Sequence, residues 1–111
     1  MDQLDRYRSI VCRLIEEYAS YKPAYGDIRT EAVVDREHDH YEVLQVGWAG
    51  DRRVHGSIIH IDIRDGKVWI EHNGPDARLG EELVAAGIPR RDIVLGFQPD
   101  ELRSLSGFGV G

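Results

Sequence analysis

The feature that most constrains this chain is the dipeptide Asp65-Gly66, which stands between two runs rich in β-branched residues. Asp-Gly favours a two-residue hairpin turn of type I′, because both central residues of that turn need a positive φ. Residues 54–73 are therefore predicted to form a tight antiparallel hairpin at the centre of the fold. The turn also sets the register of the two strands and so the face on which each side chain lies.

The predicted hairpin has two chemically different faces. A two-residue turn places His60 opposite Glu71, and residues paired in this way share a face of the sheet. One face is apolar and is expected to form a wall of the core: Ile59, Ile61, Ile63, Val68 and Ile70. The other face mixes polar and aromatic side chains: Ile58, His60, Asp62, Trp69 and Glu71. This second face is too polar for a core wall and too aromatic for an ordinary solvated surface.

Composition limits the class of protein. The chain has 111 residues and a formal net charge of −6, which fits one domain over residues 1–111 and disfavours a nucleic-acid binder that must neutralise phosphates. Arg52 and Arg53 are weak candidates for a phosphate contact, so DNA is expected to be reached only through partners. A single cysteine, Cys12, excludes a disulfide within the chain, and we expect a soluble cytoplasmic protein without a membrane span or a cofactor.

The flanking segments complete an α+β fold, with an antiparallel sheet of four to five strands. Apolar residues at steps of three and four predict a helix over residues 4–19, capped by Asp2 and packed on the isoleucine face. A second helix is expected after residues 73–75, with Pro75 in its first turn and its end at Gly87. The predicted strands span residues 28–35, 40–48 and 93–97 besides the hairpin, and the segment after Pro99 is expected to be loosely held.

The strand over residues 40–48 alternates, but its orientation depends on the turn at residues 49–52. A symmetric turn puts Tyr41, Val43 and Gln45 on the polar face. The same turn puts Leu44, Val46 and Trp48 on the isoleucine face. An odd-length turn or a β-bulge reverses both assignments.

Three residues of the polar face suggest chemistry: His60, Asp62 and Glu71, with His40 near them. An imidazole and two carboxylates within reach of one another can bind a divalent metal or act as an acid and base set. They can equally form an ordinary cross-strand pair. A restriction-type nuclease would also need a lysine where this chain has Asn73. The consecutive residues 37–40 point in different directions and are expected to form a solvated turn.

Short motifs along almost the whole chain occur in the same order in one known family. They are Glu17-Tyr18-Ala19, Lys22-Pro23 with Tyr25-Gly26-Asp27, Asp39-His40-Tyr41, Val46-Gly47-Trp48, Arg52-Arg53-Val54-His55-Gly56, Ile59-His60-Ile61-Asp62-Ile63, Asp65-Gly66-Lys67-Val68-Trp69-Ile70, Gly87-Ile88-Pro89 and Asp92-Ile93-Val94-Leu95. Through them the chain resembles the XisI-like proteins, named for a factor that controls excision of a DNA element in heterocyst-forming cyanobacteria. The chain departs from the family pattern at residues 73–76 and 97–100.

The resemblance implies a small α+β protein that takes part in site-specific recombination without catalysing it. It implies an XisH-like protein, with an endonuclease-like fold, as the usual companion, and a separate recombinase for strand exchange. It supplies no catalytic residues.

Three hypotheses follow from the sequence. The first is a non-enzymatic accessory subunit that binds a protein partner through Tyr41, Val43, Ile58, His60, Asp62, Trp69 and Glu71, with Trp69 as the anchor. The second is a metal-dependent hydrolase that uses His60, Asp62 and Glu71. The third is a homodimer formed through the same face.

Overall fold

The protein is built on a five-stranded sheet whose strands follow the order of the chain, β1-β2-β3-β4-β5. The computed structural model describes residues 2–21, 23, 26–74 and 77–111. The elements are α1 (Gln3–Ala19), β1 (Asp27–Asp35), β2 (His40–Ala49), β3 (Arg52–Arg64), β4 (Lys67–His72), α2 (Leu79–Ala85), a 3-10 turn (Arg90–Asp92), β5 (Ile93–Leu95) and α3 (Asp100–Arg103). The first four strands are antiparallel and β5 is parallel to β4. The predicted α+β fold is confirmed.

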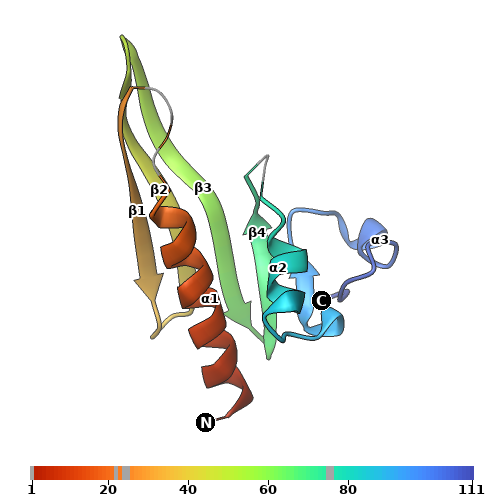
Figure 1. The fold of residues 1–111 in the computed structure, drawn as a ribbon. Coiled ribbons are helices and arrows are strands. Elements are labelled where there is room, and N and C mark those ends of the chain that lie inside the picture. Colours follow the sequence, from red (N-terminus) through yellow and green to blue (C-terminus); the bar gives the residue numbers. More distant parts are fainter. Residues whose placement is uncertain (1, 22, 24–25, 75–76) are drawn as a thin grey trace.

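Both longer helices lie on the same face of the sheet (Figure 1). Asp2 caps α1 as predicted, accepting a hydrogen bond of 2.8 Å from the Asp5 backbone N–H. The apolar stripe of α1 joins the sheet and α2 in one buried cluster: Tyr7, Val11, Cys12, Ile15, Tyr41, Val43, Ile59, Ile61, Ile63, Val68, Ile70, Leu79, Leu83, Ile88 and Ile93. Among the described residues, no helix is long and apolar enough to cross a membrane.

The central hairpin turns where the sequence predicted. Asp65 and Gly66 have φ values of 55° and 76°, as a type I′ turn requires. The predicted pairing holds from Arg64 opposite Lys67 back to Ile61 opposite Ile70. Beyond that point β4 contains one additional residue, so that His60 pairs with His72 and Glu71 has no partner in β3. The expected pair of His60 and Glu71 is therefore wrong because of a β-bulge at Glu71.

A second bulge reverses the predicted orientation of β2. The turn pairs Ala49 with Arg52, but β3 has one additional residue, Ile58, opposite the junction between Val43 and Leu44. Tyr41 therefore pairs with Ile61 and shares its face. Tyr41 and Val43 are completely buried in the core, where polar-face positions were expected.

The rest of β2 follows from this reversal, since the strand alternates without interruption. Leu44, Val46 and Trp48 lie on the face away from the helices, contrary to the expectation from a symmetric turn, and Trp48 is 49% exposed.

The second helix ends as predicted but begins later. Gly87 has a φ of 114°, and the Ile88 N–H donates to the Leu83 carbonyl over 3.0 Å, which closes the C-terminus of α2. The described part of the helix begins at Leu79, and the expected role of Pro75 lies outside the described residues. The last strand is shorter than expected and ends at Leu95.

The C-terminal segment is folded against the sheet, contrary to the expectation of a loosely held tail. Gly109 forms a bridge with Val94, and its N–H donates to the Ile93 carbonyl over 2.7 Å. The Lys67 ammonium donates to the Gly111 carbonyl over 2.9 Å. This segment covers Trp69, which is only 8% exposed.

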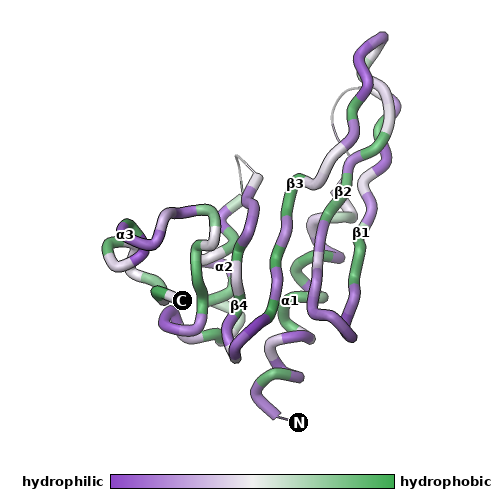
Figure 2. Tube along the Cα trace, turned by 180° about the vertical axis from the view of Figure 1, so that it is seen from behind, coloured by the Kyte–Doolittle hydropathy of each residue, from purple (hydrophilic) through white to green (hydrophobic). Residues whose placement is uncertain are grey.

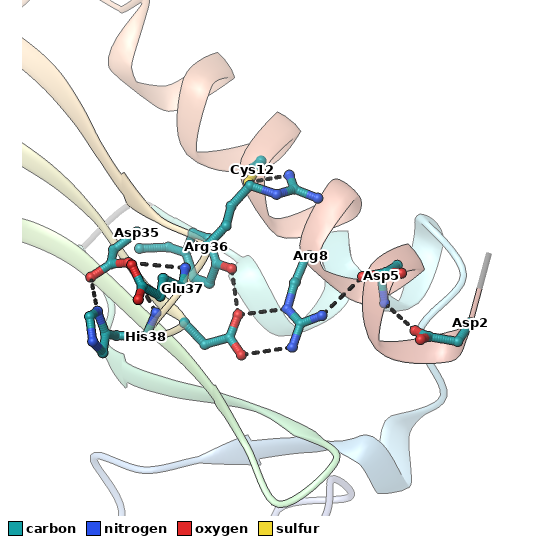
Figure 3. Close-up of polar contacts among 10 residues, drawn as sticks. Asp2, Asp5, Arg8, Cys12, Asp35, Arg36, Glu37 and His38 are labelled. Carbon is teal, nitrogen blue, oxygen red and sulfur yellow. Dashed lines mark hydrogen bonds and ion pairs between the residues drawn. The ribbon is translucent and has the colours of Figure 1, made fainter.

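An ion pair fastens α1 to the turn between β1 and β2 (Figure 3). Arg8 donates to both carboxylate oxygens of Asp39, over 2.8 and 3.1 Å, and the Tyr41 hydroxyl donates to the same group over 2.7 Å. Asp39 itself has a φ of 58°, a conformation that Asp and Asn tolerate better than most residues. Partial burial opposes ionisation, but the hydrogen bonds from Arg8 and Tyr41 hold the pKa of Asp39 below its usual value.

Asp39→Asn should lower the free energy of unfolding by about 1–2 kcal/mol at neutral pH, because it removes the charge and keeps the backbone preference. The folded-state pKa is depressed, so the loss is full above the ordinary pKa of 3.8 and disappears as pH falls through the lowered value. Urea unfolding at several pH values measures this difference. Glu31→Gln, in the exposed pair with Arg29, is the control and should change stability little. Equal losses in both variants would contradict the assigned role of Asp39.

Gly109→Ala should loosen the segment over Trp69, because a Cβ there would lie 2.4 Å from the Arg91 carbonyl oxygen. We expect a loss of about 1–3 kcal/mol and a red shift of Trp69 fluorescence, measured in a Trp48→Phe background. Gly56→Ala is the matched control, since a Cβ at that position has nothing within 4 Å. An unshifted spectrum in the folded Gly109 variant would show that the segment does not shield Trp69.

Candidate functional site

The candidate site is the face of the sheet that carries neither α1 nor α2, seen in Figure 2 from the side opposite that of Figure 1. Because side chains alternate along a strand, every second residue of β2 lies on this face. We call it the open face, and its members from β2 are His40, Glu42, Leu44, Val46 and Trp48. The face divides into a polar half near the β1–β2 turn and a more apolar half near the β2–β3 turn.

Two adjacent cross-strand pairs form the polar half. His40 lies opposite Asp62, and Glu42 lies opposite His60. His40 Nδ1 and His60 Nε2 each lie 2.8 Å from the same oxygen, Asp62 Oδ1. The other ring nitrogen of His60 lies 3.9 Å from Glu42 Oε1. The sheet register therefore brings two imidazoles to one carboxylate oxygen.

The electrostatics of this group are dominated by Asp62. The hydrogen bond to Asp62, and then the negative charge of that carboxylate, raise the pKa of His40 above its usual value. One donor atom from each of His40, His60 and Asp62 lies within 4.8 Å of the others. Two imidazole nitrogens and one carboxylate form a ligand set that suits a divalent transition metal.

The second half of the open face has an apolar and aromatic row along β2, flanked by polar and charged residues of β1 and β3. Leu44 and Val46 of β2 are half-buried here, opposite Glu31 and Arg29 of β1, and the exposed Val33 pairs with Glu42 at the border of the polar half. Trp48 follows in the same row, and the Arg53 guanidinium stacks 5.3 Å from the centre of its ring. Arg52 and Arg53 are both exposed at the start of β3. An exposed tryptophan beside a guanidinium is typical of protein-binding surfaces.

Comparison with known proteins identifies the family. The model of the XisI protein family matches residues 1–110. The chain belongs to the XisI family. It is 39% identical to an XisI-like protein from Anabaena variabilis ATCC 29413, over 98% of this chain and 100% of that one, with a TM-score of 0.91. It is 33% identical to the fdxN element excision controlling factor XisI of the same organism, over 99% and 100%, with a TM-score of 0.81. No curated protein matches the sequence.

In this XisI family member, the three predicted chemical residues do not converge. His60 and Asp62 are adjacent on the open face, but Glu71 lies at the bulge of β4. A Cβ at Gly96 would lie 2.1 Å from Glu71 Oε1, so the carboxylate occupies the space left by that glycine. His40 takes the place that was expected for Glu71, because β2 is the strand that pairs with this part of β3.

The predicted partner-binding residues are divided between two sides of the XisI fold. Tyr41 and Val43 are in the core. Ile58 lies on the helix side, where it lines a hollow with Tyr18 and Gln45. Trp69 is on the side of Asp62 but lies between the guanidinium groups of Arg64 and Arg103, 3.9 and 5.2 Å from its ring centre.

Sequence reasoning missed several residues of the open face: Val33, Glu42, Leu44, Val46 and Trp48. The alternation of β2 groups the last four with His40 in any register, so the set itself was visible in the sequence. Its orientation was not, since it depends on the bulge at Ile58. The residues at 37–40 diverge as expected: His38 pairs with Asp35, Asp39 with Arg8 and His40 with Asp62.

Proposed function

We propose that this protein is a non-enzymatic accessory factor that acts with an XisH-like protein and a recombinase to control excision of a DNA element. Membership of the XisI family supports this role, as does the likeness to a protein named as the fdxN element excision controlling factor. The observation that carries the proposal is the open face, where Trp48 lies 49% exposed in one row with the half-buried Leu44 and Val46, on the side of the sheet that carries neither α1 nor α2 (Figure 1).

The open face has the composition of a binding surface. Trp48 and its apolar neighbours supply an anchor, and His40, Glu42 and Asp62 supply a polar margin. The net charge of −6 favours association with a basic DNA-processing protein over direct association with DNA. We therefore propose that the factor reaches DNA only through its partners, and a cytoplasmic location is part of the same proposal.

A metal-dependent hydrolase built on His60, Asp62 and Glu71 has less support. Glu71 lies beside Gly96 and not beside the other two residues. The position two residues after Glu71 is Asn73, where restriction-type chemistry would need a lysine. DNA cleavage by this chain would therefore lack both the second carboxylate and the lysine.

The XisH-like protein from the same source should form a heavier complex with this chain on a sizing column with light-scattering detection. Trp48→Ser should raise the Kd at least about tenfold, because it removes the largest exposed side chain of the open face. Leu105→Ser is the matched control: Leu105 is 81% exposed on the C-terminal segment, and its variant should bind normally.

Two outcomes would contradict the proposal. One is the absence of any complex with the folded wild-type chain. The other is an equal loss of binding in the Trp48 and Leu105 variants. If the chain alone runs as a homodimer that Trp48→Ser dissociates, the open face serves self-association, and the accessory role must use another surface.

A further inference from the structure

We propose that His40, His60 and Asp62 form a binding site for a single Zn²⁺ ion on the open face. Two imidazole nitrogens from different strands approach one carboxylate oxygen, each over 2.8 Å. Neighbouring ligand atoms around a tetrahedral zinc ion are about 3.3 Å apart when each bond is about 2.0 Å long. To admit the ion, side-chain rotations must open these two contacts by about half an ångström and bring the two imidazole nitrogens, which lie within 4.8 Å of each other, to the same spacing.

The second ring nitrogen of His60 supports the site. It lies 3.9 Å from Glu42 Oε1, which leaves Nε2 directed at Asp62. Histidines that bind metals usually donate their other N–H to a carboxylate, which fixes the orientation of the ring. At 3.9 Å the Glu42 carboxylate is beyond hydrogen-bond distance, so its role as a positioning residue for His60 requires the two side chains to approach by about 1 Å when the ion binds.

The donor set favours a divalent transition metal, and zinc is proposed over iron(II), which two histidines and a carboxylate also bind, because a tetrahedron needs only one further ligand. Calcium and magnesium prefer ligand sets made of oxygen atoms, and copper(I) prefers sulfur. Two imidazoles with one carboxylate suit zinc, which needs a fourth ligand to complete a tetrahedron. The side chain of His40 is 58% exposed, so the fourth position faces solvent and is filled by water.

The chain also contains a matched control for the site. His38 Nδ1 lies 2.9 Å from Asp35 Oδ2, a histidine–aspartate pair of nearly the same length, with both side chains more exposed. No second imidazole approaches Asp35 among the described residues. A histidine–aspartate pair that merely attracts zinc would do so at both places.

Titration calorimetry with ZnCl₂ tests the proposal on chelator-treated protein from which any purification tag has been removed. We expect one zinc per chain in the wild type and in His38→Gln. His40→Gln and His60→Gln should each lose binding, and Glu42→Gln should weaken it about tenfold. Circular dichroism verifies that each variant is folded. If His60→Gln does not fold, His40→Gln decides the test, because His40 is exposed and its replacement should not disturb the fold.

Three results would overturn the proposal: no zinc binding by the wild type, unchanged binding in His40→Gln, or loss of binding in His38→Gln. The zinc site needs no partner protein, so this experiment and the XisH-like binding experiment can fail separately.

Discussion

One additional residue, Ile58, determines which side chains of β2 meet the helices. In a β-bulge two residues of one strand lie opposite a single residue of its neighbour, and the alternation of faces shifts by one position. Ile58 and Ile59 both contribute to the helix side of β3. Tyr41 and Val43 therefore lie on the same side, in the buried cluster against which α1 packs.

The polar group of the open face exists because of the same bulge. Without the bulge, the register that starts with Ala49 opposite Arg52 would continue unchanged and would place His40 opposite Ile61, on the helix side. The insertion moves His40 opposite Asp62 and Glu42 opposite His60. The residue that places Tyr41 and Val43 in the core thus also brings two histidines and two carboxylates together on the opposite surface. This is why the candidate site and the hydrophobic core cannot be altered independently at Ile58.

Features set by local chemistry could be predicted from the sequence. The Asp65-Gly66 turn, the Asp2 cap and the end of α2 at Gly87 each depend on residues within one turn of the chain. The bulges could not be predicted, because neither Ile58 nor Glu71 is a glycine or a proline that would mark one. The burial of Trp69 could not be predicted either, since its cover depends on contacts of Gly111 with Trp69 and Lys67, which join distant parts of the chain.

The two tryptophans exchange the roles that the symmetric register assigned to them, and this exchange locates the surface available to a partner. Trp69 is enclosed by Arg64, Arg103 and the C-terminal segment, whereas Trp48 lies exposed in the same row as Glu42 and His40. A zinc ion and a protein partner on the open face would therefore share one surface. The ion adds positive charge beside the carboxylates and offers a fourth coordination position. By linkage, zinc must change the affinity for such a partner by the same factor as the partner changes the affinity for zinc.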